Sequence, residues 1–267
     1  MAADIKALRT RIKSVTSTHH LTTAMGLVAS SKIRRATDAM VKSRQYAEAV
    51  TQTIGLLTAC AECRKSAYMR MADTDAPRTR LIVIAGDRGM AGGYNANVFR
   101  LTATYPDAEI VAIGKRACDR YGQAVLSSED ITYAEARDIA AAQCAAFAAG
   151  EYDRLGIVRT QYISMMSQQP TVQWILPLTA AEDTQSTGVI FEPDERTILD
   201  AAVPEYVVGE LIAAIRESFN CEVVARRMAM DSAGKNAQTM LDDLQLRYNR
   251  ARQGNITQEI TEIVAGS

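Results

Sequence analysis

Residues 206–263 read YVVGELIAAIRESFNCEVVARRMAMDSAGKNAQTMLDDLQLRYNRARQGNITQEITEI and contain no proline. Apolar residues recur along this stretch about every 3.5 residues, which is the spacing of a coiled coil. As one helix it would span roughly 85 Å, so it must extend beyond any small domain and pair its apolar seam with another helix. The seam consists of Leu211, Ile215, Phe219, Val223, Met230, Ala233, Ala237, Leu241, Leu244, Tyr248, Ala251, Ile256, Ile260 and Ile263.

The N-terminal residues offer the partner helix. Apolar residues recur there at three- and four-residue steps, which is typical of a helix. All six prolines lie from Pro77 to Pro204, and a proline inside a helix costs about 3 kcal/mol, so both ends are free to form long helices. We predict that the two ends pair as a long antiparallel coiled coil. The predicted N-terminal seam is Ile5, Leu8, Ile12, Val15, Leu21, Met25, Val28, Ile33, Ala36 and Met40.

The middle of the chain carries a different pattern. Short apolar runs alternate with polar, glycine-containing or helical segments such as residues 133–149. Strands alternating with helices indicate an α/β sheet. We therefore expect a Rossmann-like α/β domain at 77–204, inserted between coiled-coil helices at 1–65 and 205–267. The predicted strands cover residues 80–85, 109–113, 155–158 and 171–176.

Composition excludes several classes of protein. The chain has 267 residues, 48% of them hydrophobic, and a formal net charge of −1. It can therefore bury a core, and its overall charge gives no argument for nucleic acid or a membrane. No apolar run approaches the roughly 18 residues of a membrane helix, so we expect no direct insertion into a bilayer. Residues 1–50 nevertheless have nine Lys and Arg against three Asp and Glu, which makes a basic arm.

Residues 86–94, GDRGMAGGY, follow the first predicted strand, where phosphate-binding loops lie in nucleotide-binding domains. The segment lacks the G-x-G-x-x-G spacing, and the chain has no G-x-x-x-x-G-K-[ST] motif. We therefore expect a tight turn that needs glycine for a positive φ, with Asp87 as a local cap, and no cofactor.

Catalytic and metal-binding constellations are missing from the sequence. The only histidines, His19 and His20, are adjacent and fall on different faces of a helix. Cys60 and Cys63 are expected within a continuing helix and not at a strand-to-helix junction, so they fit free thiols better than a redox pair. We predict no catalytic or metal site and expect that the chain is not itself an enzyme.

Two basic clusters leave alternatives open, because they are either solvated helix faces or contacts to phosphates or acidic protein loops. One alternative is a nucleic-acid-binding protein that uses the basic N-terminal arm, although the apolar seam and the missing aromatic platform count against it. Another is an α/β enzyme, for which the strand ends offer no acid–base pair. The clusters are Lys32, Arg34 and Arg35, and Arg247, Arg250 and Arg252.

Three distant blocks resemble the F-type ATP synthase gamma subunits. Residues 24–35, AMGLVASSKIRR, look like the family's N-terminal helix signature. Residues 225–236, ARRMAMDSAGKN, and 248–263 resemble its C-terminal signature, and residues 86–93 are similar to its Ser-Asp-Arg-Gly-Leu-Cys-Gly-Gly turn. Departures include Gly26, where a longer side chain is usual, and Gly86 in place of serine. The blocks occur in the family's order and cover nearly the whole chain.

The resemblance implies a role. The coiled coil would stand as the central rotor shaft inside a ring of three alpha and three beta subunits. The α/β domain would sit beside the epsilon subunit on the membrane c-ring. The chain would couple transmembrane ion flow to ATP synthesis or hydrolysis without catalysing either. It would be a peripheral subunit on the cytoplasmic face of a cell membrane, most simply a bacterial one.

The resemblance also assigns residues, and the apolar end of the C-terminal helix is expected to turn inside a hydrophobic sleeve. The contact zone with a beta-subunit catch loop would comprise Arg252, Gln253, Thr257 and Glu259. A basic collar facing acidic beta-subunit levers would comprise Arg88, Lys32 and Arg35. The coupling region would include Met25 and Arg227, and the foot on the membrane ring Phe191, in place of a usual Tyr, and Glu192. The apolar bearing tip would comprise Ile256, Ile260 and Ile263.

Overall fold

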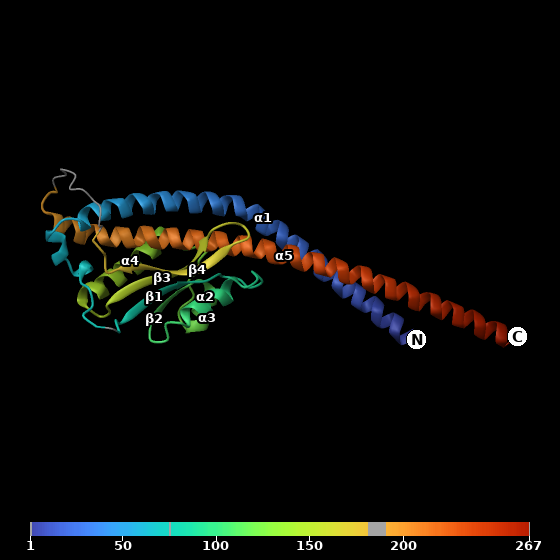
Figure 1. The fold of residues 1–267 in the computed structure, drawn as a ribbon. Coiled ribbons are helices and arrows are strands. Elements are labelled where there is room, and N and C mark those ends of the chain that lie inside the picture. The colour runs from blue at the N-terminus through green and yellow to red at the C-terminus, as the bar shows by residue number, and fades with distance from the viewer. Residues whose placement is uncertain (1, 75, 181–190, 267) are drawn as a thin grey trace. The chain divides into compact units, whose positions relative to one another are not determined.

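The computed structural model describes residues 2–74, 76–180 and 191–266, without the side chains of residues 2–4 and 259. It comprises two compact units, residues 32–225 and the paired ends 1–31 and 226–267. Two helices contribute to both units: α1 (Ala2–Thr58) and α5 (Glu195–Ala265), drawn in blue and orange-red in Figure 1. Each unit is described by itself.

In the unit of paired ends, α1 and α5 run antiparallel. Arg9 Nη2 of α1 donates a hydrogen bond of 2.9 Å to the Tyr248 hydroxyl of α5. Further along α1, Gly26 lies against Arg227, which comes earlier in α5. Residues later in α1 therefore contact residues earlier in α5, which confirms the predicted antiparallel pairing.

The seam of α1 differs from the prediction between residues 21 and 29. The side chains of Leu21 and Val28 are 59% and 56% exposed, whereas Thr22 and Ala29 are buried. Gly26 is buried with them and faces Arg227. The physical reason is that long side chains on α5 fill the space between the helices here, so the seam of α1 must be built from small residues.

The seam of α5 follows the prediction as far as Ala251, with Tyr248 and Ala251 half-buried, and then ends. Ile256, Ile260 and Ile263, predicted to continue it, are 47%, 57% and 72% exposed. Arg9 faces Tyr248, so the described residues of α1 leave the last turns of α5 uncovered. The buried seam residues of α5 include Leu211, Ile215, Val223, Met230, Ala237, Leu241 and Leu244.

Residues 32–225 contain a four-stranded sheet in the order β2-β1-β3-β4. Its strands are β1 (Thr79–Ile84), β2 (Glu109–Ile113), β3 (Arg154–Tyr162) and β4 (Gln168–Leu176). β1 is parallel to β2 and β3, and β4 is antiparallel to β3. All four strands lie where the sequence predicted them, with β3 and β4 longer than expected because they form a hairpin.

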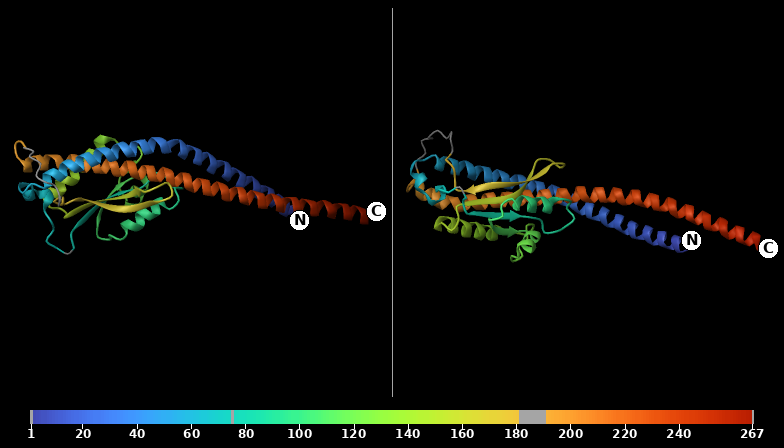
Figure 2. Two further views of the ribbon diagram at one scale, coloured as in Figure 1. Left: turned by 45° about the horizontal axis from the view of Figure 1, so that its top comes forward. Right: turned by 60° about the horizontal axis from the view of Figure 1, so that its bottom comes forward.

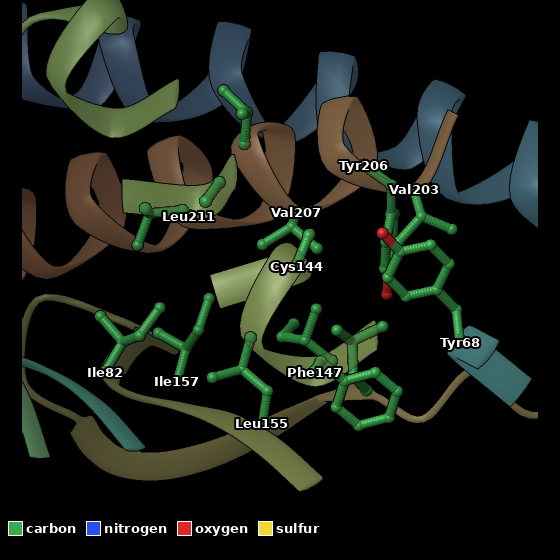
Figure 3. Packing of buried hydrophobic residues seen from close by; sticks show 14 of the residues in the cluster. Tyr68, Ile82, Cys144, Phe147, Leu155, Ile157, Val203, Tyr206, Val207 and Leu211 are labelled. Atoms are coloured by element: carbon green, nitrogen blue, oxygen red, sulfur yellow. The ribbon is translucent and has the colours of Figure 1, made fainter. Parts of the chain in front are cut away.

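Helices cover both faces of this sheet. The short helices α2 (Tyr94–Thr102) and α3 (Lys115–Tyr121) cover one face, and α4 (Tyr133–Ala149) and α5 cover the other (Figure 1, Figure 2). Successive side chains of β1 point to opposite faces of the sheet, so Ile82 packs toward α4 and α5 and Val83 packs toward α2. Figure 3 shows the larger core, where Ile157 and Phe147 lie beneath Val207 of α5. This arrangement confirms the predicted class, an inserted α/β domain with long terminal helices.

The bounds of the helices follow local chemistry. α4 begins and ends where predicted, because Thr132 and Glu135 form a capping box before it and Gly150 ends it with a φ of 79°. α5 begins at Glu195, earlier than predicted, and contains Pro204. Val203 and its neighbours on the same face are fully buried in the core, so burial outweighs the cost of the proline.

The cysteines depart from the prediction in one respect. α1 ends at Thr58, and Cys63 lies in a separate 3₁₀ helix, η1 (Glu62–Lys65), so the Cys60–Cys63 segment is not a continuing helix. Another short 3₁₀ helix, η2 (Ala67–Met69), follows it. All five cysteines are free, as expected, and burial raises the pKa of the Cys63 thiol to about 11. In the described parts of the chain no helix is long and apolar enough to cross a membrane.

Candidate functional site

The loop after β1 is held by the carboxylate of Asp87. This carboxylate accepts hydrogen bonds of 2.9, 3.0 and 2.9 Å from the amides of Lys115, Ser128 and Glu129, and one of 2.8 Å from Ser127 Oγ. Burial raises the pKa of Asp87, but the bonds from the backbone amides outweigh that effect and hold the pKa below its usual value. Asp87 is therefore not the local cap we predicted, because its side chain bonds the first amide of α3 and the loop at residues 127–129.

Gly86 is needed for close approach and not for its φ. The positive φ values of this turn belong to Met90 and Gly92, at 60° and 58°. A β-carbon on residue 86 would lie 2.8 Å from Glu222 Oε1 of α5. The Gly86 amide donates a 2.9 Å hydrogen bond to Asn95 Oδ1, so a protein group already occupies the donor that a phosphate would use.

The collar residues fall into two groups. Lys32 of α1 forms an ion pair with Glu129, whose amide is held by Asp87, so Lys32 is tied to the loop that carries Arg88. Arg35 and Arg88 are exposed. The structure therefore brings Lys32 into the loop network of its own domain, while the two arginines are accessible to a partner.

The end of α5 presents the residues assigned to the catch. Arg252, Gln253 and Thr257 are exposed, and the side chain of Glu259 lies outside the described residues. The apolar tip residues Ile256, Ile260 and Ile263 are exposed as well. Large apolar side chains gathered at one exposed helix end are typical of a surface that a partner covers.

Met25 and Arg227 lie beside the small-residue seam. Both side chains are half-buried, and Gly26, the neighbour of Met25, is the residue that faces the guanidinium. A groove of about 450 Å³ between the helices includes Thr22, Gly26, Arg227 and Gly234 in its lining. The departure at Gly26 thus makes room for Arg227.

The two foot residues differ in their exposure. Phe191 is half-buried and packs against the large core of the α/β domain, whereas Glu192 is exposed. Only Glu192 therefore offers most of its side chain to a partner. Residues 181–190, immediately before them, lie outside the described part of the chain.

Sequence reasoning missed a set of buried polar residues on α5. A signal for them was present, because Glu210 and Glu217 lie one heptad apart beside the apolar seam. Within the described residues no group of three or more His, Cys, Asp or Glu could hold a metal ion. The buried polar residues are Glu210, Glu217, Ser218, Asn220 and Glu222.

Known proteins resemble this chain over its whole length. A family model described as ATP synthase matches residues 4–267. The ATP synthase gamma chain of Ruminococcus albus is 38% identical over an alignment 283 residues long, which covers 99% of this chain and 98% of that one. The sodium ion specific ATP synthase gamma chain of Acetobacterium woodii is 33% identical over 300 residues, covering 100% and 99%.

Solved structures share the fold at low identity. A chain in the rotor of the Euglena gracilis mitochondrial ATP synthase has a TM-score of 0.66 at 17% identity, covering 96% of this chain and 100% of that one. A chain in the central stalk and c-ring structure of the Tetrahymena thermophila mitochondrial ATP synthase has a TM-score of 0.61 at 19% identity, covering 80% and 99%. The two likenesses confirm the architecture of long terminal helices with an α/β insertion.

Proposed function

This chain belongs to the ATP synthase gamma chain family, and from that premise we propose that it is the central rotor shaft coupling transmembrane ion flow to ATP synthesis or hydrolysis. The observation that carries the proposal is the antiparallel pair of terminal helices, whose α5 end exposes both polar and apolar side chains. The nucleic-acid-binding alternative is set aside, because the family match covers nearly the whole chain.

The proposed partners follow from the shaft role. Three alpha and three beta subunits surround the terminal helices, and the α/β domain sits beside the epsilon subunit on the membrane c-ring. The chain is then a peripheral subunit on the cytoplasmic face of the cell membrane. The division into 1–65, 77–204 and 205–267 remains a prediction about domains, and the start of α5 at Glu195 argues for an earlier third boundary.

The chain takes part in catalysis only through its neighbours in this proposal. A shaft changes the affinity of a catalytic site only if its contacts differ between the conformations of the surrounding subunits. Shifting a two-state subunit from 1:99 to 99:1 needs about 5.5 kcal/mol of differential contact energy. Hydrogen bonds to charged groups contribute about 1.5–3 kcal/mol each, so a few of them suffice.

The exposed polar residues of α5 are suited to supply such contacts. We assign Arg252, Gln253, Thr257 and Glu259 to the beta-subunit catch. Arg252 is a permanent cation with a planar set of hydrogen-bond donors, which suits a bidentate bond to a carboxylate. Such a bond would form in only one rotational state of the shaft. The exposed arginines of the collar, Arg35 and Arg88, act in the same way on acidic levers, and Lys32 positions the collar through Glu129.

The remaining assignments concern the tip of α5, the coupling region and the foot on the membrane ring. Ile256, Ile260 and Ile263 form a bearing, since burial in a hydrophobic sleeve is non-directional and permits rotation. Met25 and Arg227 form the coupling region, where the guanidinium lies in the interhelical groove. Glu192 makes the polar contact of the foot with the membrane ring, and Phe191 anchors the foot in the core.

Co-expression with alpha and beta subunits of a related enzyme tests the proposal. We expect a complex with one copy of this chain per three beta subunits and an ATPase activity that depends on the chain. Replacing Arg252 and Gln253 by alanine removes charge-assisted bonds and is expected to lower that activity roughly tenfold. The matched control is Gln245→Ala, which is exposed on the same helix. A complex that forms and hydrolyses ATP equally well without the chain would contradict the proposal.

A further inference from the structure

Two glutamates of α5 are buried within the α/β unit, and none of the shaft contacts assigned above uses them. Glu210 is 8% exposed and Glu217 is 4% exposed. Burying a carboxylate is unfavourable unless hydrogen bonds replace its water. The partners of both glutamates therefore show what holds them in place.

Glu210 joins α1 to the sheet. Its Oε1 accepts a 2.7 Å hydrogen bond from Thr51 Oγ1 of α1. Its Oε2 accepts a 2.6 Å hydrogen bond from Gln173 Nε2 of β4. One carboxylate on α5 thus holds another helix with one oxygen and a strand with the other.

Glu217 repeats this arrangement one heptad further along α5. Its Oε1 accepts a 2.7 Å bond from Arg44 Nη2 of α1 and a 3.0 Å bond from the amide of Tyr162. Its Oε2 pairs with Arg159 Nη1 of β3. Arg44 precedes Thr51 by one heptad, so the two bridges are related by the same step along both antiparallel helices.

Smaller polar contacts continue the series. Thr37 Oγ1 of α1 donates a 3.0 Å hydrogen bond to Asn220 Oδ1 of α5. The amide of Thr160 in β3 donates a 3.1 Å bond to Ser218 Oγ. Directional bonds from α5 to α1 and to the sheet therefore accompany the apolar core between these elements.

We propose that Glu210 and Glu217 are torque clamps, positioning residues that stop α1 and α5 from turning against the sheet when the shaft is under load. The inference rests on the proposed shaft function. Apolar contacts are non-directional and resist sliding or twisting of the helices only weakly. The hydrogen bonds of each clamp are directional, and they must break before α1 or the strand moves relative to α5. The device lets the sheet and the parts of α1 and α5 that pack against it turn together.

The α1 side of both clamps can be removed while each glutamate keeps a partner on the sheet. In the double variant Thr51→Val with Arg44→Met, Glu210 retains Gln173, and Glu217 retains Arg159 and the Tyr162 amide. A groove of about 560 Å³, lined in part by Arg44 and Thr51, opens beside the clamps and accommodates the new side chains.

The matched control changes the same residue types on α1 away from the clamps. Thr53→Val removes a hydroxyl that bonds only its own helix, at Ala49 O, and Lys42→Met removes an exposed charge. A conservative variant, Thr51→Ser with Arg44→Lys, keeps a donor at each clamp. It is expected to behave like the unchanged chain.

The experiment measures the stiffness of the shaft in the assembled complex. The alpha–beta ring is fixed to a surface, and a bead is attached through a cysteine at exposed Asp138 of α4, with Cys60 changed to serine. We expect the angular variance of the bead during a catalytic dwell to rise about twofold or more in the clamp variant, because two directional restraints are lost. The control and the conservative variant should match the unchanged chain.

The outcomes separate this inference from the proposed function. An unchanged complex that fails to assemble or rotate overturns the shaft function itself. An unchanged complex that rotates, with equal variance in the clamp variant and its control, overturns the clamps. If the double variant does not assemble, Thr51→Val and Gln173→Leu are measured singly, and a variance equal to that of the control in both variants likewise overturns the clamps.

Discussion

Gly26 of α1 lies against Arg227 of α5, so that a β-carbon on residue 26 would be 3.1 Å from Arg227 Nη1. A glycine in the middle of a long helix is unfavourable by about 0.5–1 kcal/mol relative to alanine. At this position the guanidinium of Arg227 lies in the space that the glycine leaves open. The pair therefore sets how closely α1 and α5 approach in the unit of paired ends.

The Gly26→Ala change should stabilise the chain. The contacting atom is the far end of a flexible side chain, which can move by a few tenths of an ångström. We expect the gain in helix propensity to dominate and to raise the free energy of unfolding by about 0.5–1 kcal/mol. Urea unfolding followed by circular dichroism measures it. A loss of stability instead would mean that Arg227 is held rigidly in its groove.

The Gly86→Ala change should destabilise the chain. The new β-carbon would lie 2.8 Å from Glu222 Oε1 and 2.9 Å from Glu222 Cγ, and Glu222 is only 3% exposed and cannot swing into solvent. We expect a loss of about 1–3 kcal/mol in the free energy of unfolding. The control is Gly55→Ala in α1, where no atom lies within 4 Å and a small gain is expected. Equal effects of the two changes on the unfolding midpoint would contradict this account.

Asp87 should make the stability of the chain sensitive to acid. Its folded-state pKa is lowered, so it contributes stability that is present above the ordinary aspartate pKa of 3.8 and is lost as pH falls through the lower folded-state pKa. Asp87→Asn should lower stability at neutral pH and weaken its dependence on pH below about 4. Thermal melting between pH 7 and pH 3 measures both effects. The exposed Asp138→Asn serves as the control, and parallel pH profiles for the two variants would refute the prediction.

The bearing is tested at the apolar tip. Ile260 is 57% exposed in the chain alone, and the proposed sleeve would bury it. Ile260→Asp places a charge in that sleeve and should slow rotation in the assembled complex, because an unpaired buried charge is costly. Rotation rate at saturating ATP is the measurement, with Gln258→Asp on the same exposed turn as the control. A rate equal to that of the unchanged chain would exclude a bearing at this position.

Much of the fold could be predicted from local patterns. The four strands and α4 follow from apolar alternation and from turn and cap residues, which act within a few positions of the chain. The start of α5 could not be predicted in this way. Proline is unfavourable inside a helix, but the burial of Val203 and Val207 outweighs this cost at Pro204. The α1 seam at Thr22, Gly26 and Ala29 depends on which α5 side chains lie opposite, and apolar spacing carries no such information.

The candidate site was predictable only in part. The exposed residues of the α5 end came from resemblance to the family, and their exposure agrees with contacts to a partner. The roles of Asp87 and Lys32 depend on loops that meet only in the folded chain. Glu210 and Glu217 were visible as charges beside an apolar seam, but their partners on α1 and the sheet lie far away in sequence.

The most direct test of the shaft function is to watch the chain turn. The alpha–beta ring is fixed to a surface, a bead is attached to a cysteine introduced at Asp138, and ATP is added. The account predicts rotation in one direction, in steps that track ATP hydrolysis, and slower steps when Arg252 and Gln253 are changed to alanine. Steady hydrolysis by a complex in which the bead stays still, although the chain is present in one copy, would contradict it.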